Sequence, residues 1–141
     1  METAKKPTKK TIFYSGLGRR KRSVARVWLY EKKGEFTVNS KKIEEIYPSI
    51  EDDITWVKPF HTVGVSHPKS KFSATILVKG GGIRGQLQAI QLGITRALIK
   101  LDPANKESLK KAALTTRDPR EVERKKTSQP KARKKVQYSK R

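Results

Sequence analysis

The segment SKFSATILVKGGGIRGQLQAIQLGITRALIKL, residues 70–101, is the most informative about the fold because it holds the clearest strand and the clearest helix of the chain. Apolar and polar residues alternate from Phe72 to Lys79, which predicts a strand with one buried face over residues 70–79. After three glycines, apolar residues recur at helical spacing from Leu87 to Leu101, which predicts an amphipathic helix. A strand and a helix that each have one apolar face are expected to pack together.

A second helix is predicted directly after the first. Asp102 and Pro103 end the first helix, and they suit the cap and the first position of the next one. We therefore expect this second helix to run to about Leu114.

Upstream, alternation from Thr11 to Tyr30 predicts a strand that is interrupted near Gly16 and Gly18. Turn-forming residues at 31–34 lead into a short strand over residues 35–38. These two strands are expected to form a hairpin.

Two short helices are expected between the predicted strands, over residues 41–47 and 51–57. Strands and helices in one small body favour an α+β fold. The sequence therefore predicts a two-layer sandwich, in which helices cover one face of a mixed sheet.

The net charge of +21 is concentrated at the two ends of the chain. Residues 1–33 hold eleven Lys and Arg against two acids, and residues 113–141 hold eleven against three. Residues 34–112 are closer to balance, with twelve cations and eight acids. This asymmetry indicates a polyanion as the partner.

Composition excludes several classes of protein. The chain has no cysteine, so disulfides and thiolate zinc sites are excluded, and no third metal ligand is spaced near His61 or His67. No apolar run approaches the length of a membrane span, and residues 1–10 do not resemble a secretory signal. The Asp and Glu residues between positions 44 and 53 have no neighbouring cysteine or other nucleophile, marked by a sequence motif, with which they could form a catalytic site. We expect a cytoplasmic protein that is not an enzyme and needs no metal or cofactor.

We expect three parts: a disordered basic arm over residues 1–10, a globular α+β RNA-binding body over residues 11–116 and an extended basic tail over residues 117–141. The tail has only Val122, Val136 and Tyr138 as sizeable apolar groups. Because ordering a backbone costs about 1–2 kcal/mol per residue, such a segment is expected to stay extended until it meets a polyanion. Fully extended, it would span roughly 70–80 Å. The alternative is a solvated extension without a partner.

The candidate RNA-binding residues of the tail are its cations and one aromatic ring. They are Arg117, Arg120, Arg124, Lys125, Lys126, Lys131, Arg133, Lys134, Lys135 and Tyr138. Cations that alternate with an aromatic group are typical of segments that bind phosphates and stack on bases.

A second basic cluster, Arg19, Arg20, Lys21 and Arg22, begins a predicted strand and is followed by Arg26. Alternation predicts that Arg20, Arg22 and Arg26 share one face. An edge strand that uses charge to avoid aggregation is the alternative, but four consecutive cations favour contact with RNA.

The glycine loop, Gly80, Gly81 and Gly82, lies between the predicted strand and helix with Lys79 and Arg84 on either side. Its pattern formally matches a dinucleotide-binding motif, but the strand that should follow the helix is replaced by a second helix. We interpret the loop as a place where an RNA phosphate can come close to the backbone at a helix N-terminus. An ordinary turn is the alternative.

Over residues 12–141 the chain resembles the family of the ninth protein of the small ribosomal subunit, in its bacterial form. The resemblance rests on GRRK at 18–21 leading into SVARV at 23–27, VKGGG at 78–82, LTTRDPR at 114–120, VERKK at 122–126 and the final SKR.

The resemblance implies a body similar to the second domain of the fifth small-subunit protein, bound to ribosomal RNA beside neighbouring proteins in the head of the subunit. It also implies that the tail tip, Ser139, Lys140 and Arg141, contacts transfer RNA in the peptidyl site. A free RNA chaperone or an architectural nucleic-acid-binding protein is the alternative. A nucleotide-dependent enzyme that uses residues 80–85 is a further one.

Overall fold

The computed structural model describes residues 12–139, and its centre is a five-stranded mixed sheet. The strands are β1 (Tyr14–Arg20), β2 (Ser23–Tyr30), β3 (Phe36–Val38), β4 (Lys41–Lys42) and β5 (Ser73–Lys79). They lie in the order β1-β2-β5-β3-β4. Neighbours are antiparallel except for β3 and β5, which are parallel. The predicted α+β fold with a mixed sheet is confirmed.

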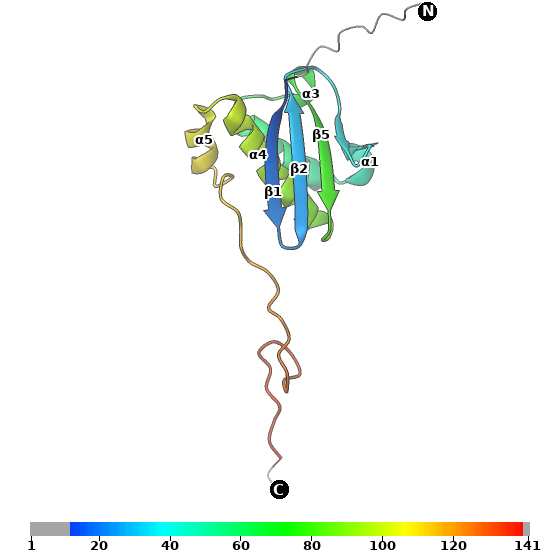
Figure 1. Ribbon diagram of the computed structural model, residues 1–141, viewed down its shortest axis with the longest axis vertical. Coiled ribbons are helices and arrows are strands. Elements are labelled where there is room, and N and C mark those ends of the chain that lie inside the picture. Colours follow the sequence, from blue (N-terminus) through cyan, green and yellow to red (C-terminus); the bar gives the residue numbers. More distant parts are fainter. Residues whose placement is uncertain (1–11, 140–141) are drawn as a thin grey trace, which may run out of the picture.

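Helices pack against this sheet, and the longest, α4, lies behind β1, β2 and β5 in the view of Figure 1. They are α1 (Ile43–Ile46), α2 (Ile50–Thr62), α3 (Pro68–Lys71), α4 (Ile83–Leu101) and α5 (Asn105–Lys111). From Ala112 to Ser139 the chain has neither helix nor strand. Its first part still contacts the body, where Leu114 is buried, and its later part extends away from the body (Figure 1). Within residues 12–139, no helix has the length and apolar composition needed to cross a membrane.

The strand and helix predicted from residues 70–101 are confirmed as β5 and α4. Phe72, Ala74 and Ile76 are buried beneath the helices, as the alternation predicts. The strand begins later than expected because Pro68–Lys71 forms the single turn of α3. Pro68 occupies the first position of that turn, where its missing N–H costs nothing.

The helix predicted to begin at Pro103 exists but starts two residues later than expected. Asp102 closes α4, and its Oδ1 accepts a hydrogen bond from Ala104 N at 3.0 Å. Helix α5 then begins at Asn105 and buries Leu109. The helix predicted over 51–57 is also longer than expected, because α2 continues through Pro59 to Thr62.

The single interrupted strand predicted for residues 11–30 is wrong. The chain instead turns tightly at Lys21 and Arg22, and β1 and β2 form an antiparallel hairpin in which Arg20 lies opposite Ser23. Lys21 adopts the left-handed conformation that such a turn requires, with φ of 48°. Gly16 and Gly18 do not interrupt the strand but lie within β1.

These two glycines let β1 approach α4 so closely that their backbones touch. A Cβ built on Gly16 would lie 1.9 Å from the carbonyl oxygen of Gly93, and one on Gly18 would lie 1.8 Å from that of Ala89. No side chain fits at either position. The absence of side chains therefore fixes the distance between the edge strand and the helix.

The predicted hairpin between the first strand and residues 35–38 is also wrong. Instead β3 crosses to the far side of β5 and pairs with it in parallel, with Val38 opposite Ile76. This position buries Phe36, whose ring centroid lies 4.9 Å from that of Trp56 and 5.6 Å from that of Phe60. Burial of this aromatic group outweighs the local tendency to form a hairpin.

Candidate nucleic-acid interface

The sheet face turned away from the helices, here called the open face, carries three of the predicted RNA-binding cations. Arg19 and Lys79 lie on either side of Val24, and the exposed Arg26 follows Val24 by two residues on the same face. The prediction that Arg20, Arg22 and Arg26 share a face is wrong. The turn at residues 21–22 puts Arg20 on the helix side and leaves Arg22 exposed at the turn.

Apolar groups accompany the cations on the open face. Leu17 and Leu77 lie on either side of Arg26 in the register of the strands and remain 38% and 44% exposed. Strands β1, β2 and β5 contain no Asp or Glu. The open face is therefore positively charged, with apolar surface between its charges.

Arg20 has a different set of partners, and they join the body to the start of the tail. Its Nε donates to Oε1 of Gln88 on α4 at 2.7 Å, and its Nη1 donates to the carbonyl oxygen of Arg120 at 2.6 Å. Its Nη2 lies 3.0 Å from Oδ2 of Asp118, and the side chain is only 11% exposed. We call Arg20, Gln88, Asp118 and Arg120 the tail anchor.

Asp118 is held in its ionised form by the same anchor. Hydrogen bonds from the Arg120 side chain and backbone, together with the nearby Arg20, hold the pKa of its carboxyl well below the ordinary range. The carboxylate is therefore charged throughout the neutral range, and the ion pair is lost only when the pH falls through this lowered pKa.

The glycine loop brings the backbone to the N-terminus of α4. Gly80 and Gly81 have positive φ values of 73° and 70°, which favour glycine. Gly82 is the N-cap and supplies no side-chain cap, so the N–H groups of the first turn have no intrahelical acceptor. Gln86 steadies the loop, because its Nε2 donates to the carbonyl oxygen of Gly80 at 3.2 Å.

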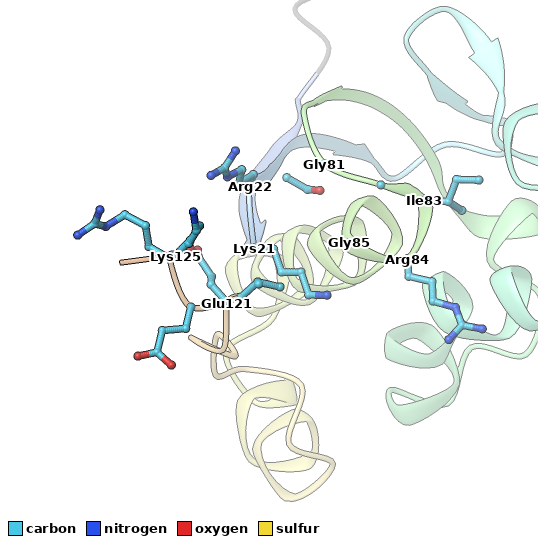
Figure 2. Close-up of a pocket in the computed structure, with 13 residues that line it drawn as sticks. Lys21, Arg22, Gly81, Ile83, Arg84, Gly85, Glu121 and Lys125 are labelled. Carbon is cyan, nitrogen blue, oxygen red and sulfur yellow. The ribbon is translucent and has the colours of Figure 1, made fainter. Parts of the chain in front are cut away.

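A cavity of about 1090 Å³ lies at this helix end, between the β1–β2 turn, the glycine loop and the start of the tail. Its walls are residues 21–23, 81–85 and 121–125 (Figure 2). The structure thus brings together predicted residues from three distant segments: Lys21, Arg22, Gly81, Gly82, Arg84, Arg124 and Lys125. We call this the composite cavity.

Ser23 also lines the composite cavity, although no sequence pattern marks this residue as functional. The residue is fully buried, and its Oγ has no hydrogen-bond partner in the described part of the chain. Only its place beside Gly81 and Gly85, which the fold determines, draws attention to this hydroxyl.

Most of the remaining tail cations are exposed. Glu123 accepts hydrogen bonds from Arg133 at 2.8 Å and Lys126 at 3.2 Å, and these lower its pKa. The side chain of Arg133 nevertheless stays 87% exposed, and Tyr138 is 97% exposed. The other predicted tail residues lie along the same segment and are exposed: Arg117, Lys131, Lys134, Lys135 and Ser139. Lys140 and Arg141, like the arm at residues 1–10, lie outside the described residues.

Among residues 12–139, no group of three or more His, Asp or Glu side chains is placed so that it could hold a metal ion. His61 contacts the carbonyl oxygen of Ser66 through Nε2 at 3.2 Å.

Comparison with known proteins gives a consistent result over nearly the whole chain. The family model described as ribosomal protein S9/S16 matches residues 18–141. Similar proteins include the small ribosomal subunit protein uS9 of Azobacteroides pseudotrichonymphae, 46% identical over 90% of this chain and 97% of its own. The uS9 proteins of Bacteroides fragilis (42%; 90% of this chain, 97% of its own) and Methylacidiphilum infernorum (45%; 88% and 89%) are also similar. The chain belongs to the ribosomal protein S9/S16 family.

Proposed function

We propose that this chain is a structural component of the small ribosomal subunit, acting in translation in the cytoplasm without catalysing a reaction. The support is its membership of a ribosomal protein family, together with relatives that are small-subunit proteins along almost their full length. Ribosomal RNA and neighbouring ribosomal proteins are then its partners. The likeness of its body to the second domain of the fifth small-subunit protein remains a prediction.

The body binds ribosomal RNA through phosphate contacts on two surfaces. Arg19, Arg26 and Lys79 of the open face meet phosphates without competition from acids on the same strands. The cations of the composite cavity supply the second surface. Each phosphate that is neutralised should steepen the dependence of log affinity on log salt by about 0.7–0.9.

The tail leaves the body from a fixed point and orders along RNA. The observation that carries this proposal is the tail anchor: Arg20 holds the backbone at Arg120, while Tyr138, further along, is 97% exposed. A segment fixed at one end and free of its own core can follow a nucleic acid outward from the body. Arg20 therefore positions the tail rather than contacting RNA itself.

The tip of the tail contacts transfer RNA in the peptidyl site through Ser139, Lys140 and Arg141. The support is the resemblance of these terminal residues to the family motif and the exposure of Ser139. Arg141 would contribute a planar guanidinium that lysine does not reproduce.

Removal of Ser139–Arg141 tests this role. Small subunits assembled with the truncated chain should form normally but hold less transfer RNA in the peptidyl site, measured by filter binding. Assembly should persist because the body and most tail cations remain. Unchanged transfer RNA occupancy would show that the tip does not make this contact.

A further inference from the structure

We propose that the exposed side of α2 is a docking surface for a basic segment of a neighbouring protein. The residues of this surface, here called the α2 patch, are Ile50, Glu51, Asp52 and Ile54. The proposal deepens the proposed function and rests on it, because it gives a place and a chemistry to the protein partners of the chain.

Two isoleucines form the apolar part of the α2 patch. Ile50 and Ile54 are one helical turn apart, so their side chains are neighbours on the surface of the helix. They are 79% and 63% exposed, whereas Trp56 and Phe60 of the same helix are buried in the core. Neighbouring apolar side chains that are exposed and rimmed by polar residues are typical of protein interaction surfaces.

The charge around these isoleucines is opposite to that of the whole chain. Residues 43–57 contain five acids and no Lys or Arg, although the chain carries a net charge of +21. Because negative charge repels phosphates, this surface does not suit the nucleic acid that the open face and the composite cavity attract. A partner with cations and apolar side chains is complementary to it, which favours a basic protein segment.

Glu51 and Asp52 offer carboxylates that such a segment can use. Asp53, the third acid of this turn, accepts a hydrogen bond from Nε1 of Trp56 at 3.0 Å. By contrast, no cation within residues 12–139 forms an ion pair with Glu51 or Asp52. Acids in the first turn also suit the helix dipole, but the dipole does not account for the exposed isoleucines beside them.

A small cavity beside the same two acids can take the end of a basic side chain. It has a volume of about 210 Å³ and is lined by Glu51, Asp52 and Thr55 of α2 and by Arg84, Leu87 and Gln88 of α4. Two carboxylates face one guanidinium there, so the net charge of its walls is negative. A lysine or arginine can lay its apolar stem along such a wall and keep its charge near the carboxylates.

Photocrosslinking within assembled small subunits identifies what covers the α2 patch. A photoreactive phenylalanine derivative replaces Ile54, whose exposure allows the change without disturbing the core. The full chain is assembled into small subunits and irradiated, and the product is digested separately with ribonuclease and with protease. We expect a ribonuclease-resistant crosslink to a segment of another protein that is rich in Lys and Arg, mapped by mass spectrometry.

Neutralising the two acids tests whether charge selects the partner. Combining Glu51→Gln with Asp52→Gln should lower the yield of this crosslink about fivefold, because the basic segment loses both carboxylates. Glu107→Gln is the matched control, since Glu107 is also an exposed acid in the first turn of a helix. The control should leave the yield unchanged, and an equal yield in the double variant would overturn the proposal.

The remaining outcomes separate this proposal from the proposed function. Crosslinks to RNA, to this chain itself or to nothing would overturn the α2 patch as a protein-docking surface but leave the proposed function intact. Failure of the natural chain to enter small subunits would contradict both.

Discussion

Gly18→Ala should strongly destabilise the body, because the new methyl group has no space between β1 and α4. Its carbon would lie 1.8 Å from the carbonyl oxygen of Ala89 and 2.7 Å from the backbone nitrogen of Gly93. Ordinary contact distances begin at 3.4 Å, so strand and helix must separate by about 1.5 Å to accept it.

The cost can be estimated from what must move. Overpacking a core costs about 1–3 kcal/mol, and the obstacle here is helix backbone rather than the end of a side chain, so we expect about 3 kcal/mol. For a body of this size, each kcal/mol lowers the melting temperature by about 4–8 °C, which gives a loss of about 12 °C or more.

Thermal denaturation followed by circular dichroism measures this loss. Gly82→Asn is the matched control, because Gly82 is also a glycine next to α4 but has open space around its Cβ position. It should melt at or above the temperature of the natural chain. If Gly18→Ala melts within about 2 °C of the natural chain, close backbone contact does not determine the position of β1.

Three further results are expected. Arg20→Lys should release the tail, because lysine lacks the planar guanidinium that reaches Gln88, Asp118 and Arg120 together. The distribution of distances between one spin label on α2 and another in the tail should then broaden, and an unchanged distribution would contradict the tail anchor. The Asp118 carboxyl should titrate below its ordinary pKa of about 3.9, so its ion pairs are present above that pH and are lost as the pH falls through the lowered pKa. A carbon-detected NMR titration with a midpoint of about 4 or higher would count against the lowered pKa. Phe36→Ala should cost about 3–5 kcal/mol in urea denaturation, because the ring is 1% exposed and packs on Trp56 and Phe60, and a loss below about 1 kcal/mol would show that the aromatic cluster repacks.

The β5–α4 unit could be predicted because its signals are local. Alternation in residues 72–79 and helical spacing from Leu87 to Leu101 each specify an element and its buried face. The expectation of a polyanion partner likewise needs no knowledge of the fold, because the charge of each segment can be counted along the sequence.

Strand pairing could not be predicted, because it depends on contacts between distant residues. Nothing near Phe36 indicates that its ring will pack on Trp56 twenty residues later, yet this packing accompanies the pairing of β3 with β5. The roles of Gly16 and Gly18 likewise become visible only when α4 lies against them.

The candidate site was predicted by residue type but not by arrangement. The basic run at residues 19–22 was identified, but the turn within it sends Arg19 to the open face and Arg20 to the tail anchor. No motif in the sequence marks Ser23 or Gln88 as part of a site. They matter because the fold places Ser23 beside Gly81 and Gln88 beside Arg20.

We infer that the tail follows RNA outward from its anchored start, and crosslinking from the far end of the tail can test this claim. A photoreactive phenylalanine derivative in place of Tyr138, whose side chain is 97% exposed, should react within assembled small subunits carrying transfer RNA. Sequencing of the attached molecules should identify ribosomal or peptidyl-site transfer RNA. Crosslinks confined to the body of this same chain would contradict the claim.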